Sequence, residues 1–292
     1  MIRYGAIDVG SNAVRLLIAD IIIDGKDIKY KKNTFIRVPV RLGDDSFVHK
    51  KISEGKAIAL VKTMVAFKNL MDVYQVSDYL ACATSAMREA ENSQELMQSI
   101  RQASGINLEI IGGEREAAII SANHIEQELD HEKQYLYIDV GGGSTELSIF
   151  VDGSFGASQS FDIGTIRMLD GKVKKEVWEK MKNWVAQHCE DFKQLNAIGT
   201  GGNINKLFRL SNEKENNPLS LKKLGDLHHQ LSSLALEKRI ETFGLNIDRA
   251  DVIVPAGEIY LTIMNWAKIK KIYVPKVGLA DGIIKLLMEQ NS

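Results

Sequence analysis

Residues 137–149, YIDVGGGSTELSI, place three consecutive glycines between two runs of the kind found in β-strands. The stretch gathers an aspartate, three glycines and a polar trio, namely Asp139, Gly141, Gly142, Gly143, Ser144, Thr145 and Glu146. Glycine has no Cβ, so the backbone N–H groups of such a turn can approach a ligand closely. Successive N–H groups in a turn form a concave site for an anion. The stretch therefore predicts a hairpin whose turn binds an anion.

The same pattern occurs a second time near the N-terminus. AIDVGSNAVRLLI (6–18) aligns with the first stretch, and its aspartate, Asp8, precedes Asp139 by 131 residues (139 − 8). This spacing is too long for a solenoid repeat. It predicts two structurally related domains that each open with a hairpin of the same design. Ser11 and Asn12 supply the polar side chains of the N-terminal turn.

Each hairpin places an aspartate at the end of a strand, beside the expected anion site. The carboxylate of Asp8 or Asp139 would repel a phosphate unless a cation lay between them. Mg²⁺ prefers oxygen ligands and keeps several waters, so it is the natural bridge. The plain alternative is an ordinary hairpin turn with a capping aspartate. Two matched copies favour the binding site over this alternative.

The composition is that of a soluble globular protein and excludes several functional classes. The chain has 292 residues, of which 45% are hydrophobic and 26% charged, and its net charge is −1. We therefore expect neither a nucleic acid nor a membrane as partner, and the longest apolar runs fall short of the roughly 20 residues of a spanning helix. The N-terminus enters a strand pattern at once, which argues against a signal peptide. The two cysteines form no metal-type cluster, so we expect a reduced, cytoplasmic compartment.

The order of the expected elements is that of an α/β protein. Strand-like runs fill the first forty residues, and a helical pattern covers about 53–72. Strands and helices then alternate, with helices expected over 88–104 and 114–127. This alternation indicates a sheet that is at least partly parallel.

The charged stretch QELDHEKQ, which begins at Gln127, is the expected domain boundary. Beyond it, three more strands with tight turns are expected. We therefore expect one domain at 1–127 and another at 128–292. A C-terminal helix at 279–292 could pack back on the first domain.

Eight stretches, taken in order, resemble motifs of one protein family. They are IDVGSNAVRLLI (7–18), ACATSAMREAEN (81–92), IIGGEREAAII (110–120), IDVGGGSTEL (138–147), FDIGTIRM (161–168), AIGTGG (197–202), RADVIVPAGEI (249–259) and VGLADG (277–282). On these motifs, nearly the whole chain resembles the exopolyphosphatase/guanosine pentaphosphate phosphatase (Ppx/GppA) family of the actin–Hsp70–sugar kinase superfamily. The resemblance implies an α/β fold of two actin-like (ribonuclease H-like) domains flanking a cleft, with no additional C-terminal helical domain. It also implies a homodimer.

The resemblance assigns phosphate binding to residues of both hairpins and of later motifs. They are Ser11, Asn12, Arg15, Thr84, Ser85, Arg88, Gly141, Gly142, Gly143, Ser144, Thr145, Arg167, Gly201 and Gly202. Guanidinium groups suit phosphate because they are forked and always charged. Arg15 and Arg88 could instead be solvated surface residues. The hydroxyls of Thr84 and Ser85 could cap a helix that starts near Arg88, or bind an anion at its N-terminus.

The resemblance also assigns the catalytic and metal-binding carboxylates. In GGEREAA (112–118), acidic residues of a first helical turn are ordinarily explained by the helix dipole. The family pattern singles out Glu116, directly before an alanine, as the catalytic base, and makes Glu146 the second candidate. The family usually carries a glutamate where this chain has Arg115. It places Mg²⁺ at Asp139, Asp8 and Glu146.

These assignments imply hydrolytic phosphoryl transfer, with Glu116 accepting a proton from a water aimed at a terminal phosphorus. We expect a magnesium-dependent exopolyphosphatase that releases terminal phosphate from polyphosphate. The alternative substrate is guanosine pentaphosphate, a nucleotide of the stringent response. A weakly hydrolytic sensor of polyphosphate or alarmone nucleotides, and a kinase of the same superfamily, remain open. Larger family members carry an extra C-terminal helical region, so a chain ending at residue 292 favours short polyphosphate or nucleotide substrates.

Overall fold

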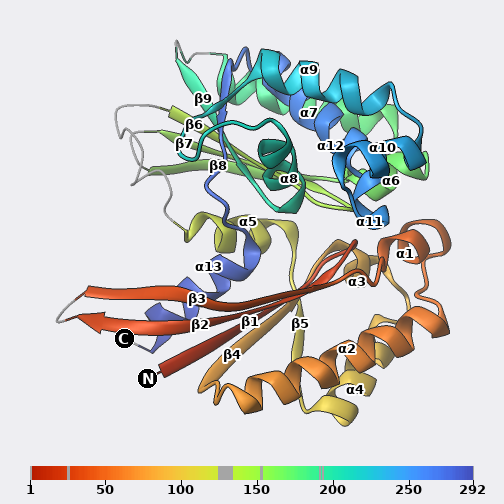
Figure 1. Ribbon diagram of the computed structural model, residues 1–292, viewed down its shortest axis with the longest axis vertical. Helices are drawn as coiled ribbons and strands as arrows, with labels where there is room; N and C mark the ends of the chain where they lie inside the picture. The colour runs from red at the N-terminus through yellow and green to blue at the C-terminus, as the bar shows by residue number, and fades with distance from the viewer. Residues whose placement is uncertain are drawn as a thin grey trace. The chain divides into compact units, whose positions relative to one another are not determined.

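The computed structural model describes residues 2–24, 27–123, 134–151, 154–190, 192 and 194–291. The chain divides into two compact units. Unit 1 consists of Met1–Asn123 and Gly278–Ser292, and unit 2 of His124–Val277. The domain boundary expected at Gln127 lies outside the described residues. Each unit is built on a mixed β-sheet that is covered by helices (Figure 1).

The sheet of unit 1 has the strand order β3-β2-β1-β4-β5 among the described residues. Its strands are β1 (Ile2–Val9), β2 (Val14–Asp24), β3 (Asp27–Val38), β4 (Asp78–Ala83) and β5 (Leu108–Ile110). The first three strands are antiparallel, and β4 and β5 run parallel to β1. The strands expected in the first forty residues and the parallel component of the sheet are therefore confirmed.

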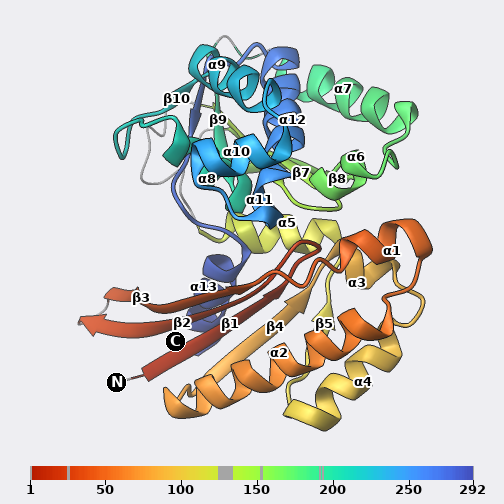
Figure 2. The ribbon, with the colours of Figure 1, turned by 45° about the vertical axis from the view of Figure 1, so that its right-hand side comes forward.

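Helices cover both faces of this sheet. They are α1 (Gly43–His49), α2 (Glu54–Val73), α3 (Ser85–Glu89), α4 (Ser93–Ser104), α5 (Gly113–Ser121) and α13 (Leu279–Gln290). Figures 1 and 2 show α2 and α4 on one face and α13 on the other. Alternate residues of β2 point to opposite faces, so Leu17 and Ala19 join the apolar cluster with α5 and α13, whereas Leu16 and Ile18 are buried on the other side.

The prediction of a single helix over 88–104 is wrong, because this segment includes residues of two separate helices, α3 and α4. Ala90 leaves the helical conformation with φ −77° and ψ 122°. Asn92 then clamps Ile52, donating from Nδ2 to its carbonyl oxygen (2.9 Å) and accepting from its N–H at Oδ1 (3.0 Å). The spacing of apolar residues along the sequence, on which the helix prediction rested, carries no sign of this long-range contact. The helix predicted over 114–127 is α5, and residues 124–127 lie outside the described residues.

The sheet of unit 2 has the order β10-β11-β9-β6-β7-β8 among the described residues. Its strands are β6 (Gln134–Val140), β7 (Thr145–Val151), β8 (Ser154–Phe161), β9 (Leu195–Thr200), β10 (Leu219–Ser220) and β11 (Lys271–Tyr273). Its helices are α6 (Thr165–Leu169), α7 (Lys175–Cys189), α8 (Gly202–Leu210), α9 (Leu221–Ser232), α10 (Leu236–Phe243), α11 (Ile247–Ala250) and α12 (Ile253–Trp266). The three strands expected after the charged stretch are confirmed as β6, β7 and β8.

The two opening hairpins share one register. In unit 1, Asp8 lies opposite Arg15 in the β1–β2 pair, and in unit 2 Asp139 lies opposite Glu146 in the β6–β7 pair. A parallel strand flanks each aspartate on its other side, with Thr200 of β9 beside Asp139. The repeat read from the sequence is therefore a repeat of strand pairing as well.

Among the described residues, the structure has no helix with both the length and the apolar character needed to cross a bilayer. Cys82 and Cys189 are buried and not disulfide-bonded.

Candidate functional site

The turn of the first hairpin is closed by backbone contacts and joined to α3. The N–H of Gly10 donates to the carbonyl of Ala13 (3.1 Å). The hydroxyls of Ser11 and Ser85 lie 2.9 Å apart, and both residues are buried. The structure thus brings together two predicted phosphate-binding residues from distant motifs. Thr84, also buried, joins the end of β1 through its N–H, which donates to the carbonyl of Val9 (3.2 Å).

Asp8 and Arg15 form an ion pair across the β1–β2 register. Arg15 Nη1 donates to Asp8 Oδ2, and the side chains are 21% and 8% exposed respectively. The guanidinium therefore neutralises the carboxylate that was predicted as a metal ligand. The contact with Asp8 also fixes the orientation of the Arg15 guanidinium beside the turn.

The connection between β3 and α1 supports the first turn from behind. The N–H of Arg41 donates to the carbonyl of Asn12 (3.0 Å), and the N–H of Gly43 donates to that of Ser11 (2.9 Å). Arg41 adopts a φ of 56°, a left-handed conformation that is costly for a residue with a side chain. The turn carbonyls are therefore occupied by backbone donors from a segment that the sequence reasoning did not include in the site.

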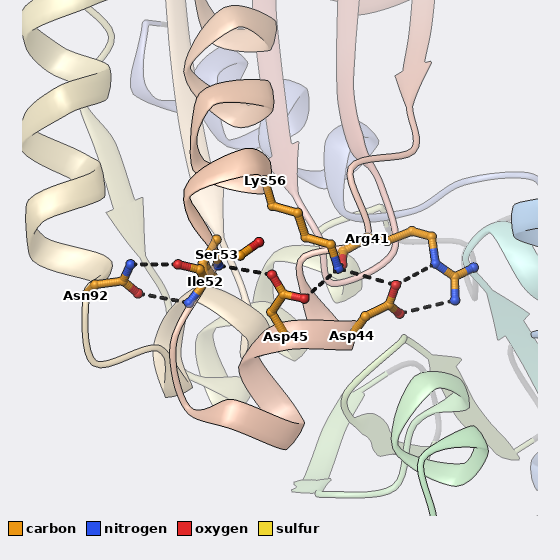
Figure 3. A network of polar contacts seen from close by, with 7 residues as sticks. All are labelled: Arg41, Asp44, Asp45, Ile52, Ser53, Lys56 and Asn92. Atoms are coloured by element: carbon orange, nitrogen blue, oxygen red, sulfur yellow. Dashed lines mark hydrogen bonds and ion pairs between the residues drawn. The ribbon is translucent and has the colours of Figure 1, made fainter.

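A charged network, drawn in Figure 3, holds this supporting segment. Arg41 binds Asp44 with two nitrogens, Nε at 2.8 Å and Nη2 at 3.1 Å. Lys56 Nζ reaches the carbonyl of Arg41 (2.6 Å) and carboxylate oxygens of Asp44 (3.3 Å) and Asp45 (3.0 Å). Asp45 also accepts from the N–H of Ser53, and this bond, together with Lys56, lowers its pKa against the opposing effect of burial. The network fixes the start of α1 against α2.

Arg88 connects α3 to the segment that leads into α5. Its Nη1 donates to the carbonyl of Ile111 (2.8 Å), directly before the turn that starts α5. Glu116 lies in the first turns of α5, is half-buried, and its N–H donates to the carbonyl of Gly112 (2.9 Å).

Arg115 points back to Glu109 of β5 (3.2 Å) and is 55% exposed. Arg115, which stands where the resemblance implies a glutamate, thus pairs with a residue of β5 and not with one of α5.

In the glycine turn of unit 2, the carbonyl groups accept hydrogen bonds from α6. The N–H groups of Thr165 and Ile166, at the start of α6, donate to the carbonyls of Gly141 (3.0 Å) and Gly142 (2.9 Å). Arg167 is buried, and its Nε donates to the carbonyl of Gly143 (2.5 Å). Within the described part of the chain, the N–H groups of Gly142 and Gly143 donate to no acceptor. A turn with bonded carbonyls and open amides is suited to an anion.

Close packing explains two features around this turn. A Cβ at Gly164 would lie 2.5 Å from the carbonyl carbons of Gly142 and Gly143, so α6 approaches the turn only because residue 164 is glycine. Thr145 is fully buried and donates its hydroxyl to the carbonyl of Ile163 (2.6 Å). Thr145 and Arg167, both predicted to bind phosphate, therefore hold the turn in this structure.

Two carboxylates lie side by side next to the glycine turn. Asp139 and Glu146 are directly opposite in the register, and each accepts a hydroxyl hydrogen bond. Thr200 Oγ1 donates to Asp139 Oδ2 (2.9 Å), and Ser160 Oγ donates to Glu146 Oε1 (2.7 Å). Residue 201 must be glycine, because its φ is 89° and a Cβ there would lie 2.7 Å from Asp139 Oδ1.

A fully buried tyrosine lies beneath these carboxylates. The hydroxyl of Tyr260, from α12, donates to the carbonyl of Thr200 (3.0 Å) and is 3.4 Å from that of Ile138. Burial, and then the nearby charge of Asp139, raise the pKa of Tyr260 well above its usual value. The hydroxyl therefore stays protonated and bridges the ends of β6 and β9. The sequence reasoning missed Ser160 and Tyr260, and it placed Thr200 on the anion-binding surface of AIGTGG without predicting its bond to Asp139.

Cations gather at the Gly201–Gly202 turn, where α8 begins. The guanidinium of Arg249 packs on Gly202, and its Nη1 donates to Asn203 Oδ1 (2.9 Å). The pKa of Lys206 is lowered by burial and then by the charges of Arg209 and Arg249. Like charges brought this close are suited to an anionic ligand.

The fold and these turns define the class of the protein. Each unit is an α/β domain that opens with a strand–aspartate–glycine turn–strand hairpin, and the whole is a protein of two actin-like domains. The chain belongs to the Ppx/GppA phosphatase family, whose model matches residues 34–291. The family expected from the eight motifs is therefore confirmed, and so is the α/β fold with two actin-like domains.

Relatives and solved structures agree with this membership. Exopolyphosphatase 1 of Mycobacterium leprae is 24% identical over 97% of this chain and 88% of its own length. A bifunctional 3-dehydroquinate synthase/phosphatase of Fusobacterium nucleatum is 28% identical over 89% of this chain, which spans 43% of that larger protein. The crystal structure of an exopolyphosphatase from Cytophaga hutchinsonii superposes with a TM-score of 0.86 at 26% identity, covering 99% of this chain and 98% of that one. An Aquifex aeolicus Ppx/GppA structure has the same fold, with a TM-score of 0.78 at 22% identity over 100% and 99% of the chains.

Proposed function

We propose that this protein is a magnesium-dependent exopolyphosphatase, which hydrolyses the terminal phosphoanhydride bond of inorganic polyphosphate. The observation that carries the proposal is the unit 2 turn, where the open amides of Gly142 and Gly143 lie next to the carboxylates of Asp139 and Glu146. An anion site beside two carboxylates is suited to a phosphate that arrives with a divalent cation. Relatives named exopolyphosphatase, of nearly the same length, support polyphosphate as the substrate.

The carboxylates of unit 2 fit a magnesium ion better than the aspartate of unit 1. Side chains directly opposite in an antiparallel pair have Cβ atoms about 4.5–5.5 Å apart, so the carboxylates of Asp139 and Glu146 can reach one cation together. Asp8 already has a cationic partner, Arg15. We therefore assign Mg²⁺ to Asp139 and Glu146, and assign Asp8 to the orientation of Arg15. When bound, the ion would neutralise phosphate charge in the ground and transition states.

The chain's own residues then have separate tasks. The amides of Gly142 and Gly143 hold oxygens of a phosphoryl group, with Ser144 beside them. Ser11, Ser85, Arg15 and Arg88 form the phosphate-binding group of unit 1. Arg88 keeps N–H groups beyond the one that holds Ile111, because a guanidinium has five.

Glu116 is the proposed general base. Its carboxylate accepts a proton from a water whose oxygen forms a bond to the terminal phosphorus. The bond from that phosphorus to the bridging oxygen breaks, and the electron pair leaves with the shortened chain. Positioning and charge stabilisation supply most of the rate in such transfers. Glu146 is the second candidate for the base, although its hydrogen bond from Ser160 and its position opposite Asp139 favour the metal role.

Phosphate release with Mg²⁺ tests the proposal on three substrates: short polyphosphate, long polyphosphate and guanosine pentaphosphate. We expect release from polyphosphate, and its loss in EDTA with recovery on adding Mg²⁺. Faster release from guanosine pentaphosphate would make the nucleotide the substrate. Tight binding of either ligand without release would identify a sensor, and transfer to an alcohol instead of water would identify a kinase. Light scattering tests the homodimer that the family resemblance implies.

A further inference from the structure

The last helix of the chain is an integral part of unit 1. After the segment that forms unit 2, residues 278–291 return and place α13 against β1, β2 and α5 (Figure 2). Ile283, Ile284 and Leu287 of α13 are buried in one apolar cluster with Ile119 and Ile120 of α5. The helix that carries Glu116 is therefore packed on a helix from the far end of the sequence.

The two helices touch at a glycine. A Cβ at Gly282 would lie 2.7 Å from the carbonyl carbon of Ile119, closer still to its oxygen, and 2.9 Å from Ile119 Cγ2. Real Cβ atoms essentially never come within 3.0 Å of a neighbour, so only glycine permits this crossing. Two of the three contacts are backbone atoms, which cannot rotate away. The distance between α5 and α13 is thus set by residue 282.

The neighbouring aspartate fixes α13 to the sheet. Asp281 is buried, and its Oδ1 accepts from the hydroxyl of Tyr30 (2.9 Å) and pairs with Lys32 Nζ (2.6 Å), both on β3. Its Oδ2 accepts from the N–H of Gly278 and so caps the helix (3.1 Å). Asn123, after the end of α5, donates to the carbonyl of Gly278 (3.4 Å). The start of α13 is therefore joined to an edge strand and to the end of α5.

We propose that Asp281 and Gly282 are positioning residues that set the place of the Glu116 carboxylate through α5. This inference rests on the proposed role of Glu116 as the base. Ile119 lies three residues after Glu116, less than one helical turn and about 4.5 Å along the axis, so a displacement at Ile119 moves Glu116 with it. Helix α5 follows a strand of three residues, Leu108–Ile110. Arg88 holds its beginning at Ile111, and α13 holds it from the other end.

The perturbation is Gly282→Ala. The added methyl must push α5 and α13 apart by a large fraction of an ångström, and a misplacement of about 1 Å in a catalytic group costs about 10²-fold in rate. We expect kcat to fall about 10²-fold and KM to stay within about threefold, since α5 supplies the base and not the proposed phosphate contacts. The matched control is Gly55→Ala in α2 of the same unit, where nothing lies within 4 Å of the added Cβ. That variant should keep full activity.

Asp281→Asn is the second variant, because it keeps the side-chain volume but removes the charge that pairs with Lys32 and the acceptor for either Tyr30 or the N–H of Gly278. We expect about a tenfold lower kcat at unchanged KM. All rates are normalised to folded protein by near-UV circular dichroism, so a loss of folded protein does not count as a loss of turnover. The pH dependence of kcat gives a second readout, and we expect its acidic limb to move in Gly282→Ala and to stay in Gly55→Ala.

Glu116→Gln separates the inference from the proposed function. A low turnover in Glu116→Gln, together with normal turnover per folded molecule in Gly282→Ala and Asp281→Asn, overturns the positioning role and leaves the base in place. Normal turnover in Glu116→Gln overturns the base and the positioning role with it. Low kcat in all three variants, with a normal Gly55→Ala control, supports the inference.

Discussion

Thr200→Val removes one hydrogen bond and little volume, so it tests whether the Thr200 hydroxyl prepares Asp139 for a metal. In the structure Thr200 Oγ1 donates to Asp139 Oδ2 at 2.9 Å, and Gly201 packs against the other carboxylate oxygen. The hydroxyl fixes the rotamer of the carboxylate. Hydrogen bonds to charged groups contribute about 1.5–3 kcal/mol, and groups that orient a metal ligand change metal affinity about 10- to 100-fold.

The assay is the initial rate of phosphate release from polyphosphate as the concentration of Mg²⁺ is varied. We expect the half-saturating Mg²⁺ concentration to rise about 10- to 100-fold in Thr200→Val. The rate at saturating Mg²⁺ should fall much less, because excess ion restores occupancy. Thr200→Ser retains the hydroxyl and should stay within about threefold of the parent protein. If Thr200→Val and Thr200→Ser both had the Mg²⁺ dependence of the parent, the hydroxyl would not orient Asp139 as a metal ligand, and this reasoning would be refuted.

Three further predictions concern single groups. Glu116→Gln should lower turnover about 10²–10⁴-fold with little change in ligand affinity, measured by steady-state kinetics and equilibrium binding; near-normal turnover would move the base to Glu146. Tyr260→Phe should lower the free energy of unfolding of unit 2 by about 1–3 kcal/mol in urea titrations, because it leaves the Thr200 carbonyl without its buried donor. The thiol pKa of Cys82 and of Cys189 is raised to about 12 by burial, so both thiols stay protonated at pH 8; iodoacetamide should label neither in the native protein and both in urea, and native labelling would contradict their burial.

Local signals predicted the hairpins well because the information lies within one short stretch. Alternation of apolar and polar residues on each side of a glycine turn fixes two strands and their register. Asp8 and Arg15 are as far apart in the sequence as Asp139 and Glu146, and each pair lies opposite in its hairpin. The pairing of Asp8 with Arg15 therefore follows from the register. The broken helix at Ala90 had no such local signal, since Asn92 is held by a residue forty positions away.

The second layer of the site could not be predicted for the same reason. Thr200 reaches Asp139 across 61 positions, and Tyr260 reaches Thr200 across another 60. Such contacts depend on how β9 lies beside β6 and how α12 packs beneath both strands, and no short pattern contains them. The position of α13 is the extreme case, because Asp281 and Tyr30 are 251 residues apart.

The two hairpins share one backbone design but differ in the charge of the residue that lies opposite the aspartate. Backbone register, glycine turn and leading aspartate are alike, but the residue opposite the aspartate is a cation in unit 1 and an anion in unit 2. In unit 1 the guanidinium of Arg15 offsets the charge of Asp8, which suits the proposed direct contact of this turn with phosphate oxygens. In unit 2 two carboxylates lie opposite each other beside the amides of the turn, which suits the proposed contact to a phosphate that arrives with a cation. The proposed reaction, with direct contacts to phosphate in one unit and a metal-bridged contact in the other, accounts for this difference.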